Sequence, residues 1–508
     1  MGKVQPAHAR RKIDIHNTNQ LVDTPTKQHL LSWGLTLFVT AIAALVRWPR
    51  LGIPNDVVFD ETYYVKDAYA LLKNGYEREA VEKANEFLLQ GRTDLYETVG
   101  SFVAHPPMGK WIIAIGQQLF GLNSFGWRFG VAVMGTLLVL VTTRVAIRLL
   151  RSIWFGSLAG FLLAIDGLAI VMSRTALLDG IMATFVMMGV GCLLLDRDRT
   201  RSLLSRKLKE NSAFGGRFTW HPWRIGAGIF LGLAIATKWS ALYYLAAIGI
   251  LTLLWEYSFK KIRRARKPFM GTFFIHSWWA AIQLIVPAFL VYLGSWTGWF
   301  RTEDGWGRNP ENPGLLNALR SLLNYHEQIW NFHINLSDEH SYEAYALGWP
   351  ILYRPTSFFY QENLSNCASS NCAQEVLAIG NPIIWWLSIL ALILLLINFL
   401  RSRNWRSGTI VFLFLAGWAP WLLLPDRTMF YFYSVVFVPF LVIAIAYIAN
   451  LIYLGVVARE SSRKAFLVIG TILLAVIIGV SVFFYPIWAA VELPKDDWLL
   501  RMWFSRWI

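Results

Sequence analysis

Long apolar runs recur along most of this chain, and they constrain its fold more than any other feature. Hydrophobic residues make up 56% of the 508 residues and charged residues only 16%, a balance typical of membrane proteins. A helix needs about 20 apolar residues to cross the hydrocarbon core. Ten runs lie at 30–48, 127–149, 153–172, 177–195, 239–259, 275–296, 381–400, 408–424, 429–454 and 466–488. A shorter run lies at 224–237. The sequence therefore predicts an all-α polytopic membrane protein with about eleven transmembrane helices.

The distribution of Lys and Arg predicts the orientation. With the N-terminus inside, the tail 1–29 and the inner loops hold 28 of the 47 Lys and Arg residues, as the positive-inside rule requires. The run WIIAIGQQLFG at 111–121 is too short to span the bilayer, so we expect an interfacial helix there. Counting it as a span would place KKIRRARK at 260–267 outside. We therefore predict a plasma-membrane protein with a cytoplasmic N-terminus and an extracytoplasmic C-terminus.

Two long extracytoplasmic segments follow from this topology, 49–126 and 297–380. The first contains YYVKDAYALLKNG and YEREAVEKANEFLLQG, which we expect to be amphipathic helices on the membrane surface. The second contains Cys367 and Cys372, and two close cysteines outside the cytoplasm are expected to form a disulfide. The predicted parts of the chain are the tail 1–29, a transmembrane module 30–296 that includes the loop 49–126, the loop 297–380, and C-terminal transmembrane helices 381–508.

The unusual charged residues map to one side of the predicted membrane. They are Asp60, Glu61, His105, Lys110, Arg128, Arg174, Asp179, Lys238 and Arg427. Charges at the membrane edge are costly and usually face a protein-lined or water-filled cavity. Their position predicts one shared cavity, as in an enzyme. The net charge of +15 comes from short basic clusters between apolar runs, so we expect no nucleic-acid partner.

Several of these charges also have a purely structural interpretation. Asp60 and Glu61 are compatible with a solvated loop or a helix N-cap. His105 and Lys110 are compatible with a helix start whose lysine reaches for the interface. Arg128 suits an ordinary interface anchor. From the residues alone, these structural alternatives stay open beside the functional one.

The later charges leave similar alternatives. Arg174 and Asp179 flank a short turn and could simply pair with each other. Arg427 could pair with Asp426 in a turn. Lys238 lies in a break between two apolar runs and needs an anionic partner, for which a phosphate is a natural choice. The chain has neither a glycine-rich phosphate loop nor the spaced His and Cys clusters of a zinc site.

In this order along the chain, FDETYY, HPPMGKW, GWRFG, MSRTALLDG and ATKWSA resemble the protein O-mannosyltransferase family of GT-C type glycosyltransferases. The resemblance continues through ALGWPILYRP, AIGNPIIWW and DRTMFYFYSVVFVPF, and it covers residues 30 to 445. It implies transfer of mannose from a polyprenyl phosphate carrier to Ser or Thr hydroxyls of proteins on the outer side of the membrane. The chain is most similar to the bacterial, actinobacterial-like branch, because 297–380 is too short for the MIR-type domain of eukaryotic members.

The resemblance also implies roles for the charged residues. The family's acidic pair matches Asp60 and Glu61, which we expect to be the base and a positioning group in an inverting single displacement. Arg174 and Asp179 are expected to bind the sugar or brace the site. The groups expected to hold the donor phosphate are Arg128, Lys238, Arg427, His105 and Lys110. Because cations can stabilise the leaving phosphate, we expect neither a metal ion nor a cofactor beyond the lipid-linked donor.

Other functions stay open at this point. A related transferase could act on a lipid or polysaccharide acceptor. A transporter of lipid or solute would more often show internal repeats and charges near the bilayer midplane. A catalytically inactive assembly partner would not need every one of these polar positions. The expected partners are polyprenyl phosphate mannose, secreted Ser/Thr-containing polypeptides, the secretion machinery that delivers them, and membrane lipid.

Overall fold

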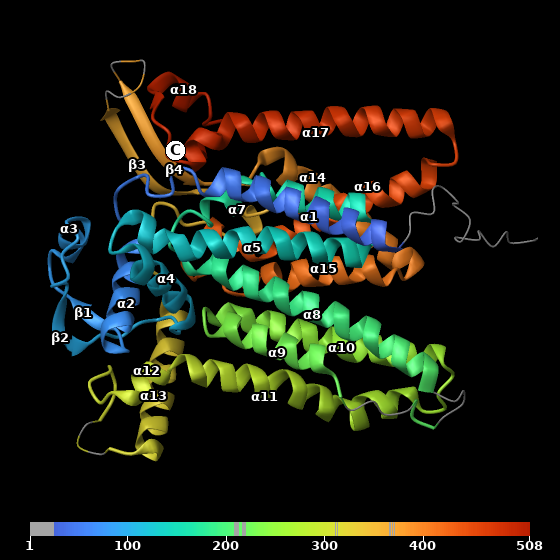
Figure 1. The fold of residues 1–508 in the computed structure, drawn as a ribbon, viewed down its shortest axis with the longest axis horizontal. Helices are drawn as coiled ribbons and strands as arrows, with labels where there is room; N and C mark the ends of the chain where they lie inside the picture. The colour runs from blue at the N-terminus through green and yellow to red at the C-terminus, as the bar shows by residue number, and fades with distance from the viewer. Residues whose placement is uncertain are drawn as a thin grey trace, which may run out of the picture.

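The protein is a bundle of long helices with its strands and several short helices, among them α3 (Ala84–Leu89) and α18 (Lys495–Leu499), at one end (Figure 1). The computed structural model describes residues 25–207, 213–215, 220–309, 311, 313–364, 367, 369 and 371–508. Most of the predicted cytoplasmic tail, residues 1–24, lies outside the described residues. We call the end with the strands and the helix after Asp60 the Asp60 end, and the opposite end the distal end.

Nine helices in the described ranges are long and apolar enough to cross a membrane. The helices that form them are α1 (Pro25–Arg47), α5 (Ser124–Leu150), α8 (Leu178–Lys207), α10 (Leu242–Ile262), α11 (Ser277–Ser295), α14 (Pro382–Ser402), α15 (Trp405–Trp418), α16 (Val438–Val456) and α17 (Glu460–Trp488). The predicted spans at 153–172 and 224–237 form only short apolar helices, α6 (Ile153–Ala164) and α9 (Pro222–Ile235). The helical membrane fold is confirmed, and the number of eleven spans is not.

The third predicted span is interrupted at Asp166. One carboxylate oxygen accepts the backbone N–H of Ala169 and caps the short helix α7 (Gly167–Val171). The other oxygen accepts the backbone N–H of Asn381 at 3.0 Å and the indole N–H of Trp385 at 2.9 Å. A buried carboxylate requires such hydrogen bonds. They end the span early and tie this break to the start of α14.

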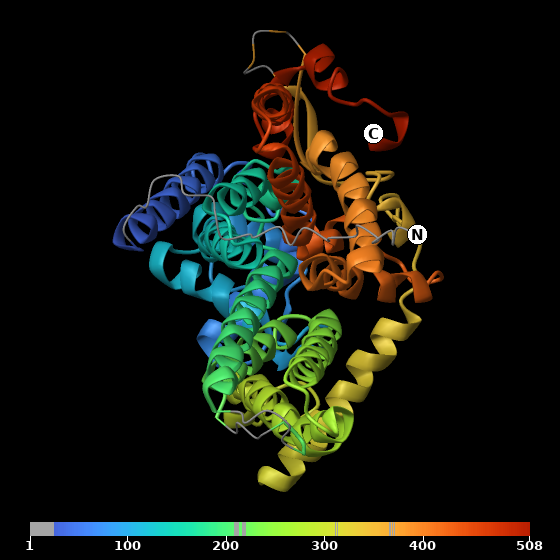
Figure 2. The ribbon, with the colours of Figure 1, turned by 90° about the vertical axis from the view of Figure 1, so that its right-hand side faces the viewer.

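The helices that lead to the charged cluster are packed closely. Helix α8 packs between α5 and α9, and α9 packs against α11. Figure 2 shows the bundle from the distal end, where α8 to α11 form one side of it. A side chain at Gly232 would begin 2.6 Å from the carbonyl oxygen of Ala288, so only glycine permits this approach of α9 to α11. This packing fixes the end of α9, from which Lys238 follows.

The first predicted extracytoplasmic segment is only partly helical. Its elements are α2 (Glu61–Asn74), β1 (Arg78–Ala80), α3 (Ala84–Leu89), β2 (Tyr96–Gly100) and α4 (Met108–Phe120). Helix α4 coincides in sequence with the predicted interfacial helix, and α2 coincides with the first amphipathic stretch. The second amphipathic stretch, from Tyr76 to Gly91, forms a helix over only six residues. Its first part instead pairs antiparallel with β2, a contact distant in sequence that overrides the local helical pattern.

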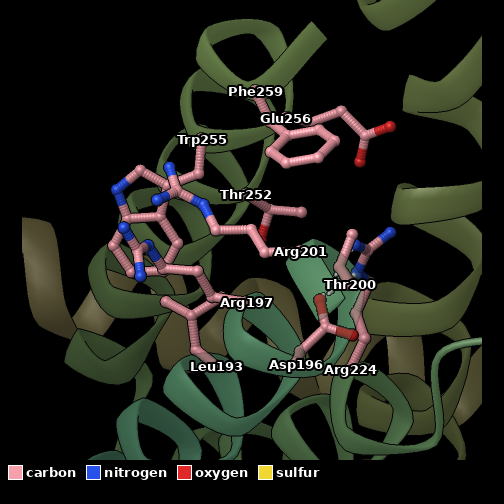
Figure 3. A pocket seen from close by; sticks show the side chains of 10 residues that line it. All are labelled: Leu193, Asp196, Arg197, Thr200, Arg201, Arg224, Thr252, Trp255, Glu256 and Phe259. Carbon is pink, nitrogen blue, oxygen red and sulfur yellow. Dashed lines mark hydrogen bonds and ion pairs between the residues drawn. The ribbon is translucent and has the colours of Figure 1, made fainter. Parts of the chain in front are cut away.

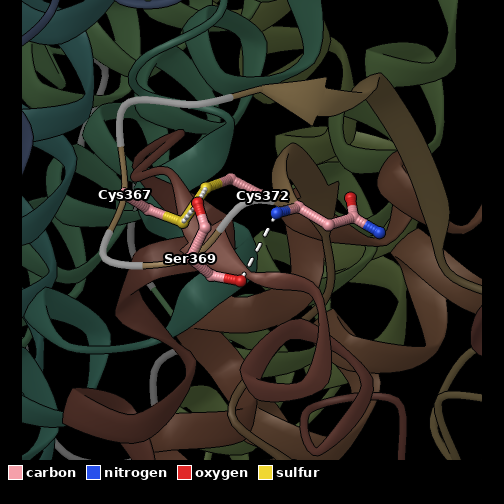
Figure 4. The surroundings of a disulfide bond; sticks show 4 residues. Cys367, Ser369 and Cys372 are labelled. Carbon is pink, nitrogen blue, oxygen red and sulfur yellow. Dashed lines mark hydrogen bonds between the residues drawn. A yellow bond between two sulfur atoms is a disulfide. The ribbon is translucent and has the colours of Figure 1, made fainter.

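The second predicted extracytoplasmic segment carries a helix and a small sheet. Its main elements are α12 (Thr297–Arg301), α13 (Leu315–Asn335), β3 (Thr356–Leu364) and β4 (Cys372–Ala378). Strands β3 and β4 pair antiparallel, and β5 (Leu493–Pro494) joins the other edge of β4 just before the last α-helix, α18 (Lys495–Leu499). Cys367 and Cys372 form the disulfide predicted from the sequence, at the tip of this hairpin (Figure 4).

Candidate active site

The start of α4 brings three of the sequence motifs together at the Asp60 end. The backbone N–H of Met108 donates to the carbonyl of Ala236, which follows α9. At Gly109 a Cβ atom would lie 2.8 Å from both Leu178, the first residue of α8, and Thr237. The HPPMGKW, MSRTALLDG and ATKWSA motifs therefore meet directly at Gly109, where the side chains of Leu178 and Thr237 leave no room for a further Cβ atom.

Asp60 lies at the start of α2, directly after a strained residue. Phe59 has a φ of +48°, which is uncommon for a residue other than glycine. Its ring stacks on Phe358 and meets Phe430 and Phe432 edge-on. Backbone strain of this kind costs about 1–3 kcal/mol and persists where the surroundings hold it. Asp60 occupies the N-cap position, but its half-buried carboxylate accepts no capping hydrogen bond within the described helix, so it stays available to a ligand.

The surroundings of Asp60 make it a stronger base than an exposed aspartate. Burial raises the pKa of Asp60 from 3.8 to about 6, against the opposing effect of the Lys238 cation. Asp179 raises this pKa further, and a hydrogen bond with Tyr64 lowers it. Asp60 is therefore mostly ionised at pH 7. A general base works best when its pKa lies near the operating pH, which suits Asp60 to take a proton from a hydroxyl group.

Lys238 forms a two-point ion pair with Asp179. Its ammonium nitrogen lies 2.9 Å from each carboxylate oxygen, and both side chains are buried. The same nitrogen lies 4.3 Å from the centre of the Tyr433 ring, a cation–π contact. This pair excludes the mutual Arg174–Asp179 pair that the sequence left open. Asp179 is the anionic partner that a buried lysine needs, so Lys238 does not require a phosphate for this purpose.

Glu61 and Arg128 form a second ion pair, which is completely buried. Two guanidinium nitrogens of Arg128 each lie 2.8 Å from one oxygen of Glu61. The other N–H groups donate to the carbonyls of Leu51, Pro54 and Asp56. All five N–H groups of this side chain are therefore used inside the protein. Arg128 has none left for a lipid phosphate, contrary to the expectation from the sequence.

The Glu61 carboxylate also binds backbone on either side of the site. It accepts the N–H of Val58 at 3.1 Å and the N–H of Ala176 at 2.8 Å. These bonds tie the start of α2 to the turn before it and to the segment before α8. Glu61 thus holds the backbone on which Asp60 sits, and the structure gives the two adjacent carboxylates different surroundings.

Arg174 and Lys110 are likewise engaged within the protein. Arg174 donates to three backbone carbonyls in residues 47–50, at 2.6 to 2.9 Å, and so closes the C-terminal end of α1. Lys110 is buried and pairs with Glu77 and, at 3.7 Å, with Asp67. Lys110 therefore neither reaches for the interface nor points to a phosphate. Both side chains brace the elements around the site.

Two stacked histidines lie beside the helix that follows Asp60. The ring centres of His105 and His333 are 5.1 Å apart, and His105 also approaches the Tyr64 ring at 6.1 Å. Nε2 of His333 donates to the carbonyl of Ala104 at 3.0 Å, which leaves Nδ1 to accept an N–H of Arg427 at 3.4 Å. Nδ1 of His105 is buried and has no hydrogen-bond partner in the described chain. This nitrogen can receive a ligand.

Both histidines are neutral at pH 7. Burial, followed by the charge of Lys238, lowers the pKa of His105 well below 6.5. Burial, followed by the charge of Arg427, lowers the pKa of His333 to about 4. The two rings therefore add no positive charge beside Tyr64, and Nδ1 of His105 is the nitrogen of the pair that can bind a ligand.

Arg427 keeps free hydrogen-bonding capacity, unlike Arg128. Its Nε donates to the carbonyl of His333 and one Nη to the carbonyl of Thr428, both at 3.1 Å. With the bond to Nδ1 of His333, three of its five N–H groups are used within the described residues. Arg427 is half-buried, and Asp426 is exposed and forms no ion pair with it in the described structure. Arg427 is therefore the arginine that is best placed to bind an anionic ligand.

A small cavity adjoins the Asp179–Lys238 pair. Its lining residues are Asp179, Met182, Ser240, Tyr243, Tyr244, Gly417, Trp421, Tyr433 and Val436. The hydroxyl of Tyr244 is buried there without a hydrogen-bond partner among the described residues. The wall is mostly apolar and aromatic with few polar groups, as in many ligand pockets.

Some residues of the site are not predicted from the sequence. Tyr64 and Tyr433 belong to the FDETYY and DRTMFYFY motifs, and this membership could have identified both as candidate site residues. His333 comes from α13 and reaches the site only through the fold. Within the described ranges no group of three or more His, Cys, Asp or Glu side chains could hold a metal ion. Metal independence stays a prediction.

Comparison with known families gives two matches that together cover most of the chain. The family model described as dolichyl-phosphate-mannose-protein mannosyltransferase matches residues 37–297. The model of the C-terminal four TMM region of protein-O-mannosyltransferase matches residues 318–507. Among curated proteins, the polyprenol-phosphate-mannose–protein mannosyltransferase of Mycolicibacterium smegmatis is 34% identical over 94% of this chain and 93% of its own length. The protein of the same name from Mycobacterium tuberculosis is 31% identical over 94% and 92%.

Solved structures give the same fold. The Saccharomyces cerevisiae protein O-mannosyltransferase Pmt1–Pmt2 complex bound to the sugar donor matches with a TM-score of 0.72, 15% identity, and coverage of 96% of this chain and 93% of that one. The archaeal oligosaccharyltransferase AglB from Archaeoglobus fulgidus, in complex with an inhibitory peptide and a dolichol-phosphate, matches with a TM-score of 0.51 and 12% identity, over 93% and 57%. The GT-C type fold implied by the resemblance is confirmed.

Proposed function

Because this chain belongs to the protein O-mannosyltransferase family, we propose that it transfers mannose from polyprenyl phosphate mannose to Ser and Thr hydroxyls of proteins. The observation that carries this proposal is the Asp60 carboxylate. This carboxylate makes no capping hydrogen bond and has a pKa of about 6, set by burial, by the charges of Lys238 and Asp179, and by a hydrogen bond with Tyr64. The acceptors are polypeptides that emerge from the secretion machinery.

In the reaction, Asp60 acts as the general base. An acceptor hydroxyl attacks the anomeric carbon of the mannose and gives its proton to the Asp60 carboxylate. The new bond from carbon to the acceptor oxygen forms as the bond from carbon to the phosphate oxygen breaks. Polyprenyl phosphate leaves as an anion, and a single displacement inverts the anomeric configuration. A positioned base contributes about 10²–10⁴ to the rate of such a step.

The leaving phosphate needs positive charge more than it needs a proton. Arg427 supplies N–H groups that are not used by the described chain, and Lys238 contributes its charge while two of its N–H groups remain on Asp179. His105 offers Nδ1 to the sugar or the acceptor. Glu61, Arg128 and Arg174 hold the backbone around the site, and Lys110 pairs with the carboxylates of Glu77 and Asp67. These cations meet the charge requirement of the step without a metal ion.

The Asp60 end faces the outside of the plasma membrane in this proposal, and the N-terminus lies in the cytoplasm. The excess of Lys and Arg in the predicted inner loops supports this orientation. The C-terminus lies at the Asp60 end (Figure 1). A reporter enzyme that is active only outside the cytoplasm should therefore be active when fused to Ile508, and an inactive fusion of a stable protein would reverse the topology.

The transfer reaction itself is tested with purified full-length protein in nanodiscs. Labelled polyprenyl phosphate mannose and a Ser/Thr-rich peptide should give labelled peptide. A matched peptide in which every Ser and Thr is replaced by Ala should give none, because it has no acceptor hydroxyl. Label that goes to lipid or polysaccharide, with none in the first peptide, would overturn the proposed acceptor class.

Replacing Arg427 with Gln should weaken binding of the carrier phosphate. Hydrogen bonds to charged groups contribute about 1.5–3 kcal/mol, so we expect Kd for polyprenyl phosphate to rise about 10- to 100-fold. Arg320→Gln is a suitable control, since Arg320 is an exposed arginine on α13 at the same end. Direct titration of both variants with polyprenyl phosphate measures the effect. Equal affinity of the Arg427 variant and wild type would remove Arg427 from the donor site.

A further inference from the structure

A second pocket, lined by several charged side chains, lies between α8, α9 and α10 toward the distal end of the bundle; Figure 3 shows it from close by. The lining residues come from α8, α9 and α10 and are Leu193, Asp196, Arg197, Thr200, Arg201, Arg224, Thr252, Trp255, Glu256 and Phe259. None of them takes part in the proposed transfer reaction.

The two carboxylates in this lining are already neutralised. The ion pairs are Asp196 with Arg224 and His221, and Glu256 with His276 and Lys260. All six side chains are buried. The acidic groups of the pocket therefore have their own partners and do not balance the two remaining arginines.

Arg197 is buried with part of its hydrogen-bonding capacity unused. Its side chain is held against two tryptophans, with the guanidinium carbon 3.3 Å from the ring centre of Trp405 and 5.2 Å from that of Trp255. One Nη lies 3.4 Å from Asp198. The Nε and the other Nη are buried without a hydrogen-bond partner in the described chain. This edge of a guanidinium is the one that binds a phosphate or carboxylate through two parallel hydrogen bonds.

Arg201 lies one helical turn further along α8 and is half-buried. Its Nε is also buried with no partner among the described residues. Figure 3 shows its side chain and that of Arg197 both extending toward Trp255. The neighbouring charges that act on Arg197 are mostly positive, from Arg201, Arg406 and Arg151, while the opposing charge comes from Asp198.

Asp198 does not balance these cations alone, because it also pairs with Arg148 at 3.0 Å. Leaving a buried donor without a partner costs about 1–3 kcal/mol, and more for a charged group. The pocket therefore has the charge and the donors to bind an anion.

The position of the pocket along α8 indicates which anion it meets. Arg197 lies about 28 Å from Leu178, the first residue of α8, at a rise of about 1.5 Å per residue. This length is close to the hydrocarbon thickness of about 30 Å. If Leu178 lies at one membrane surface, Arg197 lies at the depth of the phosphates on the other. Basic pockets between transmembrane helices at this depth are typical binding sites for lipid headgroups.

We propose that this pocket binds the phosphate group of an anionic phospholipid from the leaflet at the distal end. The free edge of Arg197 makes two parallel hydrogen bonds to the phosphate, and Arg201 makes a further one. The tryptophans hold the Arg197 plane in place. The bound lipid would join α8, α10 and α15, so it links the transmembrane module to the C-terminal helices.

The test uses full-length protein in detergent and native mass spectrometry. The protein is titrated with phosphatidylglycerol, with zwitterionic phosphatidylcholine, and with inorganic phosphate. We expect retained phosphatidylglycerol, and about tenfold or greater weakening of its binding in Arg197→Gln, Arg197→Lys and Arg201→Gln. Arg197→Lys keeps the charge but loses the two-point geometry, so it separates specific binding from simple attraction. Arg401→Gln removes an exposed arginine at the same end and should change binding less than about twofold.

Each outcome decides the proposal. Weakening in the variants with phosphatidylglycerol alone supports a lipid ligand. Binding of inorganic phosphate that Arg201→Gln abolishes, without retained phosphatidylglycerol, would overturn the lipid as the ligand and assign the site to a soluble phosphate. Equal retention of phosphatidylcholine, or unchanged phosphatidylglycerol binding in folded Arg201→Gln protein, would overturn the proposal. Arg201 is only half-buried, so this variant keeps the test valid even if the Arg197 variants do not fold.

Discussion

Replacing Asp60 with Asn is expected to lower kcat for mannose transfer about 10²- to 10⁴-fold. The amide has nearly the same shape as the carboxylate but cannot accept the proton of the attacking hydroxyl. Because Asp60 is the N-cap residue and makes no capping bond within the described helix, its replacement leaves α2 intact. Transfer to the Ser/Thr peptide at saturating donor measures this loss.

Two controls separate lost chemistry from lost structure. Polyprenyl phosphate should bind Asp60→Asn about as tightly as wild type, since the carrier phosphate meets Arg427 rather than Asp60. Asp338→Asn changes an exposed carboxylate at the Asp60 end and should keep wild-type activity. Full activity of folded Asp60→Asn protein would show that another group is the base.

Replacing Arg128 with Met should destabilise the fold strongly. The change leaves Glu61 as a buried charge without its cation, and breaking a buried pair in this way costs about 3–5 kcal/mol. It also removes the donors to three backbone carbonyls. A large drop in the midpoint of thermal unfolding of the purified protein measures the effect.

The double variant Glu61→Gln with Arg128→Met tests the cause of that loss. It has no unpaired buried charge, so it should recover part of the stability that Arg128→Met loses. Arg92→Gln is the matched control, because Arg92 forms an exposed ion pair with Asp94, and we expect its unfolding midpoint to match wild type. If Arg128→Met unfolds at the same temperature as wild type, the ion pair does not stabilise the site. Arg128 would then again be a candidate to bind the donor phosphate.

The order of the sequence motifs is enough to predict the fold class, which is confirmed, and it indicates a candidate site, but it does not predict which charges pair. From their local motifs alone, Arg128 and Lys110 are reasonable candidates to bind a phosphate. Their partners, Glu61 and Glu77, lie 67 and 33 residues away in the chain. Helix packing decides these pairs, and local sequence carries no signal for them.

The breaks within apolar runs show a different limit. A hydropathy window counts 153–172 as one span, although Asp166 interrupts it by capping a new helix and binding the start of α14. A lone Asp in an apolar run is a usable signal for such a break. His333 offers no comparable signal, since α13 reaches the site through contacts with residues 103, 104 and 427, which are distant in sequence.

The pH dependence of kcat/KM, measured for wild type and for the residual activity of Asp60→Asn, tests the central claim most directly. A base that must be ionised is active above its pKa and is lost below it. Because the pKa of Asp60 is about 6, wild-type kcat/KM should fall about tenfold per pH unit below pH 6. The Asp60→Asn protein should lack this acidic fall. The same fall in both proteins would assign the titration to another group and contradict Asp60 as the base.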